Sequence, residues 1–270
     1  MEHVKPFLKW AGGKYRCINH VLRALPHATR LVEPFTGSGA VFLNVPYTHY
    51  LLGEVNADLV ALYEHVKYQG KTFIDDCQDF FCSKNNQEEQ YYKFRVQFNQ
   101  SLIGTPQRAA LFLYLNRHGY NGLCRYNLSG GYNVPFGRYK KPYFPRQELF
   151  SFHQKSQNAC FIRADFRQTF SYTKPGDIIY CDPPYVPLSK TSHFTAYACQ
   201  KFGITEQIAL AELAAKTAKH GVPVIISNHD TPFTRELYRA SDITSFSVSR
   251  NISCKGSQRL SVRELIAVFA

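Results

Sequence analysis

The chain has 270 residues and carries 32 Lys and Arg against 20 Asp and Glu, a formal charge of +12 at neutral pH. Hydrophobic residues make up 44% of the chain and aromatic residues 15%, which excludes an intrinsically disordered protein. The longest uninterrupted apolar run, Ala109–Leu115, is too short for a membrane span, which needs about 20 apolar residues. Lys9 and Lys14 interrupt the stretch where a secretory signal would be apolar. We therefore expect a cytoplasmic protein with no membrane partner.

Four short apolar runs are predicted strands of one mostly parallel sheet, and the first two lead into a glutamate. They are Arg30–Pro34, Tyr50–Val55, Asp177–Asp182 and Val222–Asn228. The segment Glu206–His220 predicts a helix, because an acid begins it, basic residues end it and Gly221 follows where a cap belongs. Strands separated by helices indicate an α/β fold whose sheet is covered by helices on both faces.

Between residues 58 and 144 the pattern changes to long aromatic-rich helical stretches followed by loops rich in Gly, Asn and Pro. We interpret residues 58–144 as an insertion into a domain made of residues 1–57 and 145–270. A window of 57 residues, Tyr91–Gln147, contains no Asp or Glu and thirteen Tyr or Phe. Its basic residues are Lys93, Arg95, Arg108, Arg117, Arg125, Arg138, Lys140, Lys141 and Arg146.

Basic residues interleaved with aromatic ones suit a surface that neutralises phosphates and stacks against bases. The alternative is a solvated basic face over an ordinary aromatic core. The absence of any acid over so long a window favours a polyanionic partner.

The segment Val32–Phe42 contains Gly37-x-Gly39 directly after a predicted strand. Glycine lets the backbone approach a ligand closely, although a plain tight turn explains the pattern too. Phe42 stands where a third glycine would be needed for a dinucleotide pyrophosphate. Glu54 ends the next strand, where an acid can accept both hydroxyls of a ribose or simply cap a turn. Together these residues indicate a cofactor that contains adenosine but no pyrophosphate.

The segment Tyr180–Tyr185 reads Tyr-Cys-Asp-Pro-Pro-Tyr and follows a buried strand. The two prolines have no N–H groups, so the turn leaves a carbonyl available at the carboxyl end of the strand, where ligands bind in open α/β sheets. A carbonyl beside the Asp182 carboxylate makes a two-acceptor site for an amino group, and Tyr185 offers a face for a planar ring. The alternative is a rigid turn with an incidental aspartate.

A third motif, Phe7–Lys14, reads Phe-Leu-Lys-Trp-Ala-Gly-Gly-Lys. Alone it indicates an anchored N-terminal strand or loop; beside the other two motifs it is expected to close over the cofactor. In this order the three motifs resemble those of the Dam-type DNA adenine-N6 methyltransferases. The resemblance covers nearly the whole chain and includes Phe112–Asn127, Asn133–Pro145 and Ile226–Thr231.

The resemblance implies a Rossmann-like, S-adenosylmethionine-dependent methyltransferase sheet, with residues 58–144 as an inserted, mostly helical domain that recognises the DNA target. It implies methylation of adenine N6 in GATC within double-stranded DNA. The chemistry is assigned to Asp182, Pro183, Pro184 and Tyr185. Cofactor contacts are assigned to Trp10, Lys14, Pro34, Phe35, Gly37, Gly39, Glu54, Asp165, Phe166 and Asp182. DNA contacts are assigned to Lys9, Tyr120, Asn121, Leu123, Arg125, Pro135, Arg138 and Tyr139.

Two further features of the sequence bear on the resemblance. Position 54 carries Glu where similar family members carry Asp, a change we expect to affect affinity rather than role. The basic stretch Ser249–Arg259 is expected to grip the DNA backbone.

The eight cysteines include no Cys-x-x-Cys pair, so we expect buried free thiols and no metal. No obligate protein partner is implied.

Our mechanistic hypothesis is methyl transfer to an adenine turned out of the duplex, with Tyr120 filling the gap and Tyr185 stacking the base. Asp182 and the Pro183 carbonyl would accept hydrogen bonds from the amine. A second enzymatic interpretation is methylation of cytosine N4, of RNA or of a protein glutamine. Those enzymes resemble this motif with Ser or Asn at its first position, so Asp182 disfavours them. A non-enzymatic DNA-binding protein would leave the intact motifs unexplained.

Overall fold

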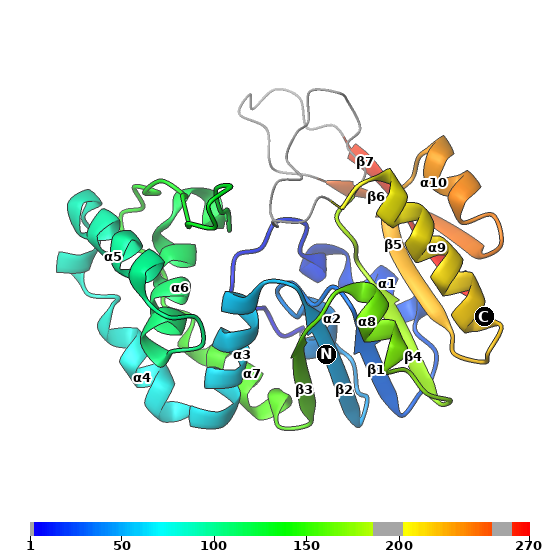
Figure 1. Ribbon diagram of the computed structural model, residues 1–270, viewed down its shortest axis with the longest axis horizontal. Helices are drawn as coiled ribbons and strands as arrows, with labels where there is room; N and C mark the ends of the chain where they lie inside the picture. The colour runs from blue at the N-terminus through cyan, green and yellow to red at the C-terminus, as the bar shows by residue number, and fades with distance from the viewer. Residues whose placement is uncertain (1–2, 186–201, 250–260) are drawn as a thin grey trace.

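The computed structural model describes residues 3–185, 202–249 and 261–270, and these fold around a seven-stranded sheet of order β3-β2-β1-β4-β5-β7-β6 (Figure 1). The first five strands are parallel, and β7 runs antiparallel between β5 and β6. The strands are β1 (Arg30–Glu33), β2 (His49–Glu54), β3 (Ala159–Arg163), β4 (Asp177–Cys181), β5 (Val224–His229), β6 (Asp242–Ser249) and β7 (Ser261–Phe269). The four predicted strands are confirmed as β1, β2, β4 and β5.

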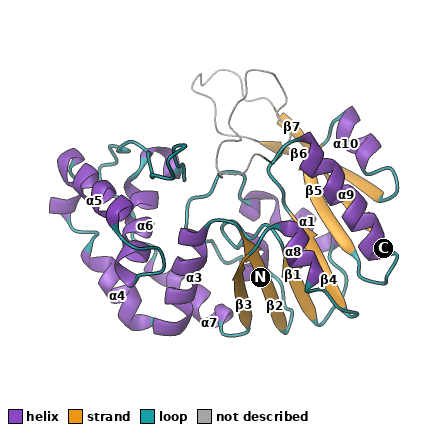
Figure 2. Cartoon of the chain, in the orientation of Figure 1, coloured by secondary structure: helices purple, strands orange, loops and turns teal. Residues whose placement is uncertain are grey.

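Helices cover both faces of the sheet, as Figure 2 shows. Successive residues of a strand point to opposite faces, so Leu31 of β1 lies in one hydrophobic cluster and Val32 in the other. The first face is covered by α1 (Ile18–Ala24), α2 (Ala40–Asn44), α3 (Ala57–Gln69) and α7 (Arg146–Ser156). The second is covered by α8 (Phe166–Ser171), α9 (Ile204–Ala218) and α10 (Pro232–Leu237). The α/β fold with a doubly covered, mostly parallel sheet is confirmed.

The predicted helix Glu206–His220 is confirmed as α9, although it begins two residues earlier and ends at Ala218. The Glu206 side chain accepts a hydrogen bond from the Gly203 N–H at 2.8 Å, which satisfies a donor at the start of the helix. Gly221 has a positive φ of 79° but lies three residues beyond the last helical residue. It therefore turns the chain toward β5 instead of capping the helix directly.

The chain between β2 and β3 is helical and forms the left part of Figure 1. It contains α3, α4 (Lys71–Asp79), α5 (Glu88–Gln100), α6 (Pro106–His118) and α7. The apolar run Ala109–Leu115 is the buried centre of α6, and one hydrophobic cluster continues from it to the sheet. The predicted boundary at residue 58 falls in the first turn of α3, which packs against β2 and β3.

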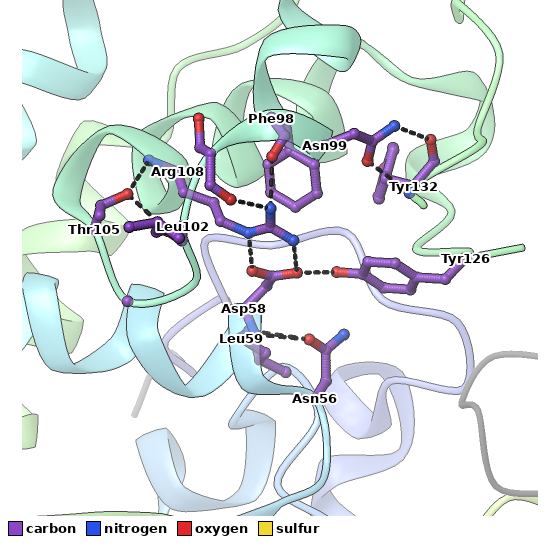
Figure 3. Close-up of polar contacts among 12 residues, drawn as sticks. Asn56, Asp58, Leu59, Phe98, Asn99, Leu102, Thr105, Arg108, Tyr126 and Tyr132 are labelled. Carbon is purple, nitrogen blue, oxygen red and sulfur yellow. Dashed lines mark hydrogen bonds and ion pairs between the residues drawn. The ribbon is translucent and has the colours of Figure 1, made fainter. Parts of the chain in front are cut away.

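A buried ion pair joins the helices of this part (Figure 3). Arg108 of α6 donates to both carboxylate oxygens of Asp58 in α3, Nε to Oδ1 at 2.6 Å and Nη2 to Oδ2 at 3.1 Å. Its remaining nitrogen donates to the Phe98 and Ser101 carbonyls, and the Tyr126 hydroxyl donates to Asp58 Oδ2 at 2.7 Å. The sequence pattern counted Arg108 in a basic surface. That was wrong for this residue, because its charge is buried and neutralised.

The cysteines only partly follow the expectation of buried thiols. Of the six in the described ranges, Cys17, Cys77, Cys124 and Cys181 are buried, whereas Cys160 is exposed at the edge strand β3. The described residues contain no group of three or more His, Cys, Asp or Glu placed to hold a metal ion. They likewise include no helix of the length and apolarity that crossing a membrane requires.

Removing one partner of the buried pair should cost far more than removing both. We expect Arg108→Met to lower the free energy of unfolding by about 3 to 5 kcal/mol, because it leaves the Asp58 carboxylate buried and uncompensated. The double variant Asp58→Asn/Arg108→Met should recover part of that loss, and Tyr126→Phe alone should cost about 1 kcal/mol. Urea denaturation measures all three. Wild-type stability in Arg108→Met would contradict the structural role.

Candidate active site

Acidic residues lie at the carboxyl ends of three neighbouring strands. Glu33 ends β1 and leads into the glycine turn, Glu54 ends β2, and Asp182 follows β4. Parallel strands bring their carboxyl ends to one edge of the sheet, and β1 is paired with β2 on one side and β4 on the other. The order of the strands reverses between β1 and β4. In open α/β sheets a ligand crevice lies at such a reversal.

The turn after β1 is held in a left-handed conformation by its neighbours. Gly37 and Gly39 have φ values of 48° and 69°, a region that favours glycine. The Thr36 hydroxyl donates to the carbonyl of Gly53 in β2 at 3.0 Å, and the Tyr63 hydroxyl donates to the Gly37 carbonyl. The backbone of the turn is therefore fixed before any ligand binds, with no side chain at either glycine.

Glu54 connects this turn to the end of β2. Its Oε2 accepts the Gly37 N–H at 3.2 Å, and its Oε1 accepts the Asn56 N–H at 3.0 Å. Burial raises the pKa of the Glu54 carboxyl, and the backbone hydrogen bonds partly oppose that shift. A carboxylate has about four acceptor positions, so these bonds do not use all of them. Glu54 thus closes the turn before α3 and also lies beside the glycine turn.

The N-terminal segment, Phe7–Lys14, packs across the glycine turn. The Trp10 indole lies so close to Gly37 that a Cβ added there would be 2.9 Å from Trp10 Nε1. A Cβ at Gly13 would lie 3.5 Å from Ser38 Oγ. The Trp10 indole and Gly37 of the glycine turn are therefore neighbours.

Lys14, the last residue of this segment, contacts the Asp182 carboxylate. Lys14 Nζ lies 2.9 Å from Asp182 Oδ1 and donates to the Gly12 carbonyl at 3.0 Å. It also lies 4.5 Å above the centre of the Tyr185 ring. The Tyr185 hydroxyl donates to Glu264 Oε2 of β7 at 3.2 Å. The N-terminal segment, the loop after β4 and strand β7 thus meet around Asp182.

Burial and charge act in opposite directions at this pair. Burial raises the pKa of the Asp182 carboxyl, and the Lys14 ammonium lowers it but does not fully cancel the effect. Burial by itself lowers the pKa of the Lys14 ammonium. The negative charges of Asp182 and Glu264 outweigh burial, so the pKa is raised overall. Lys14 therefore stays protonated and holds Asp182 nearer to its ionised form.

The remaining predicted cofactor residues form an aromatic group at the same edge. Phe35 stacks on Phe166 with ring centres 5.7 Å apart, and Phe202 contacts both rings edge-on. Asp165 caps α8 by accepting the Gln168 N–H at 2.8 Å. Pro34 is buried beneath the turn. The structure thus brings every predicted cofactor residue to the carboxyl edge of the sheet.

Apart from Lys9, the predicted DNA contacts lie on a largely irregular segment, residues 119–139, that follows α6. Tyr120 is 46% exposed, and its N–H donates to the Pro135 carbonyl at 2.8 Å. Arg125 donates to the Asn133 side chain and carbonyl at 2.7 and 3.1 Å. Among the described residues other than glycine, only Asn121 and Arg138 have positive φ. Leu123, whose N–H donates to the Tyr120 carbonyl at 3.1 Å, closes the turn.

Lys9 links this segment to the N-terminal segment. Its ammonium lies 3.9 Å above the Tyr139 ring, and its side chain packs against Gly122, where an added Cβ would lie 2.2 Å from Lys9 Cβ. Burial and the nearby Arg117 charge lower the pKa of Lys9. The buried Asn116 fixes both partners, because it accepts the Lys9 N–H and donates to the Lys9 and Gly122 carbonyls. One segment therefore contacts both the predicted DNA residues and Asp182.

The basic window divides into internal and exposed charges. Arg95 donates to the Val134 carbonyl and Arg117 to the Tyr143 carbonyl. Three others pair with acids from outside the window: Lys93 with Glu89, Arg138 with Glu88 and Arg146 with Asp75. Arg125, Lys140 and Lys141 are exposed. The window is therefore less positive at its surface than its composition indicates.

Sequence analysis missed two buried polar residues of this region. Glu33 is 2% exposed, and its Oε1 has no hydrogen-bond partner among the described residues. Burial raises the pKa of the Glu33 carboxyl well above its usual value. Asn116 directly follows the apolar run of α6, and that lone amide was the available signal. The stretch Ser249–Arg259 lies almost wholly outside the described residues.

A family model described as D12 class N6 adenine-specific DNA methyltransferase matches residues 10–252. The chain belongs to this family. It is 49% identical over 270 residues to the DNA adenine methylase of Vibrio cholerae serotype O1, covering 100% of this chain and 97% of that protein. For the DNA adenine methylase of Escherichia coli K12 the identity is 47% over 269 residues, covering 100% and 96%. For that of Serratia marcescens it is 47% over 270 residues, covering 100% of both.

As an N6 adenine-specific DNA methyltransferase, the chain is an enzyme whose substrate is DNA. The predicted resemblance and the predicted reaction, adenine methylation of DNA, are confirmed. The alternatives of cytosine, RNA or protein glutamine as acceptor, and of a DNA-binding protein without activity, are set aside by the family.

The single tryptophan of the sequence makes the glycine turn measurable. We expect Gly37→Ala to shift the Trp10 emission to longer wavelength and to destabilise the fold by at least about 1 to 2 kcal/mol, since Cβ meets the indole and φ is positive. Gly104→Ala is the matched control, because its φ is 89° and no atom lies within 4 Å of an added Cβ. An unchanged emission spectrum in Gly37→Ala would contradict the contact.

Proposed function

We propose that the enzyme transfers a methyl group from S-adenosylmethionine to N6 of an adenine turned out of double-stranded DNA at GATC, in the cytoplasm. One observation carries the proposal: the Asp182 carboxylate follows β4 beside a glycine turn, with Lys14 and Tyr185 against it. That arrangement supplies an acceptor for an amino group next to a place where backbone can approach a ligand.

The glycine turn and its neighbours fit an adenosine-containing donor. The backbone at Gly37 and Gly39 has no side chains to obstruct a ligand, and Glu54 retains acceptor positions for ribose hydroxyls. Phe35 and Phe166 provide apolar ring surface at the same edge. S-adenosylmethionine supplies a sulfonium-bound methyl group, and its leaving sulfur is neutral, so the chemistry itself calls for no metal.

Asp182 and the Pro183 carbonyl are proposed to direct the adenine amine. Its lone pair is delocalised into the ring, which makes it a poor nucleophile. Hydrogen bonds from the two N6 hydrogens to two fixed acceptors would hold the amine so that its lone pair points at the methyl group. Positioning of this kind, together with fixed charge, supplies most of the acceleration in such a reaction. Lys14 keeps the Asp182 carboxylate ionised for this task.

An adenine inside a duplex cannot reach Asp182, so the base must leave the stack at a cost of a few kcal/mol. Tyr120 is the proposed wedge, because it is exposed on a turn that Pro135 and Leu123 hold in place. Tyr185 is the proposed stacking partner of the flipped base. Lys9, Asn121, Arg125, Arg138 and Tyr139 are the proposed contacts to bases or phosphates.

The GATC target rests on the resemblance of the stretches Phe112–Asn127 and Asn133–Pro145 to the family. It is tested by incubating the protein and S-adenosylmethionine with unmethylated plasmid and mapping N6-methyladenine at base resolution. We expect methylation confined to GATC. Methylation at another site would overturn the assigned DNA contacts, and no methylation without added S-adenosylmethionine is the required control.

The role of Asp182 is tested by Asp182→Asn, which keeps the size of the side chain but removes its charge and one acceptor. We expect the single-turnover rate of methyl transfer to fall about 100- to 1,000-fold, as when one preorganised group is lost from an active site. The affinity for duplex DNA should stay within about twofold, because the proposed DNA contacts are elsewhere. An equal loss of DNA binding would mean that Asp182 is structural.

A further inference from the structure

The loop after β4 has few backbone N–H groups that could form hydrogen bonds within the loop. Pro183 and Pro184 have no N–H, so neither can donate a backbone hydrogen bond. The Pro184 carbonyl instead accepts a hydrogen bond from the side chain of Gln207, with Nε2 2.8 Å from the oxygen. Gln207 lies in the first turn of α9, on the other side of a stretch that the described residues do not include.

Gln207 stands on the apolar face of α9. Leu210, Ala211 and Ala214 follow it at helical spacing and lie in the core, and Gln207 itself is 1% exposed. Burying an amide among these residues costs free energy unless its polar atoms are hydrogen-bonded. The position is therefore one where an apolar residue is expected, and the amide needs a specific reason.

The orientation of the Gln207 amide is fixed by its partners. A carbonyl only accepts, so the NH₂ group of Gln207 faces Pro184 and its Oε1 faces away. Oε1 lies 3.0 Å from Asn228 Nδ2 and 3.4 Å from the Tyr238 hydroxyl. Asn228 Nδ2 also donates to the Tyr238 hydroxyl at 2.9 Å. Both residues are fully buried, so the network cannot exchange its partners for water.

A second contact joins the same network to Tyr185. Asn228 Oδ1 accepts a hydrogen bond from the His229 N–H at 2.9 Å. The His229 ring contacts the Tyr185 ring edge-on, with ring centres 4.6 Å apart. Pro184 is therefore held from α9 and Tyr185 from the end of β5. Asn228 touches both connections.

We propose that Gln207 is a positioning residue for the Asp182–Tyr185 loop, with Asn228 and Tyr238 fixing its amide. The inference rests on that loop being the acceptor site. Pro183 and Tyr185 flank Pro184, whose carbonyl accepts the hydrogen bond from Gln207. Loss of that bond would displace the proposed acceptor carbonyl of Pro183 and the proposed stacking ring of Tyr185 together. Gln207 touches neither the base nor the methyl donor, and its effect is on geometry, where a displacement of about 1 Å can cost about 100-fold in rate.

The test is Gln207→Glu, which keeps the size of the side chain and an oxygen for Asn228 and Tyr238 but replaces the N–H that faces Pro184. We expect a single-turnover rate of methyl transfer about 10- to 100-fold below wild type at about pH 8. The dissociation constants for a GATC duplex and for S-adenosylmethionine should stay within about twofold. The rate and affinity measurements together separate positioning from binding.

A pH profile provides a readout that a merely structural role would not change. The introduced carboxyl group faces a carbonyl oxygen, and once protonated it can donate a hydrogen bond to that oxygen. The ratio of variant to wild-type rate should therefore rise as the pH is lowered from about 9 to about 6. A ratio that stays constant over this range would overturn the proposed hydrogen bond.

Two further variants complete the design. Gln154→Glu makes the same substitution on an exposed position of α7, outside the acid-free window, and should have the wild-type rate. Tyr238→Phe removes one hydroxyl from behind Gln207, should lower the rate severalfold, and provides the test if Gln207→Glu does not fold. Wild-type rates in both Gln207→Glu and Tyr238→Phe would overturn the inference. Absence of methyl transfer by the wild-type enzyme would instead contradict the proposed function, so the two failures are distinguishable.

Discussion

The ion pair between Lys14 and Asp182 is the contact on which the arrangement of the site depends. It joins the end of the N-terminal segment to the loop after β4, and the same ammonium lies over the Tyr185 ring. A buried carboxylate without a partner would take up a proton, because burial disfavours its charge. Lys14 supplies that partner from within the chain. The proposed acceptor carboxylate is therefore oriented by a contact within the chain, and Lys14 favours its ionised form.

The N-terminal segment gives this ion pair a wider consequence. Within a few residues of one another, Lys9 contacts the region proposed to read DNA, Trp10 contacts the glycine turn and Lys14 contacts the Asp182 carboxylate. Asn116 locks its Lys9 end to α6 by hydrogen bonds in both directions. Residues 119–139 are thus connected to Asp182 through the N-terminal segment and its short contacts. The Gln207 network holds the opposite side of the same loop.

Much of the sheet is predictable because β1, β2, β4 and β5 are buried on both faces and appear as uninterrupted apolar runs. Other strands are not predictable in this way: the edge strand β3 exposes Cys160, and β7, which lies between β5 and β6, carries Arg263 and Glu264 within its length. The motifs locate the site because they encode backbone geometry locally. Its side-chain contacts join residues far apart in the sequence, so neither the partner of Lys14 nor the amide of Gln207 is visible in a pattern. Composition likewise cannot separate the buried Arg108 from exposed basic residues.

The most direct test is the pH dependence of single-turnover methyl transfer in Lys14→Met. The proposed mechanism needs an ionised Asp182, and without the adjacent cation the pKa of that carboxyl rises further, with Glu264 and Tyr185 still facing it. We therefore expect the acidic limb of the rate profile to move to higher pH. Lys71→Met, which removes a lysine from an exposed pair with Asp75, should leave the profile unchanged. A Lys14→Met profile with its acidic limb at the wild-type pH would contradict the account.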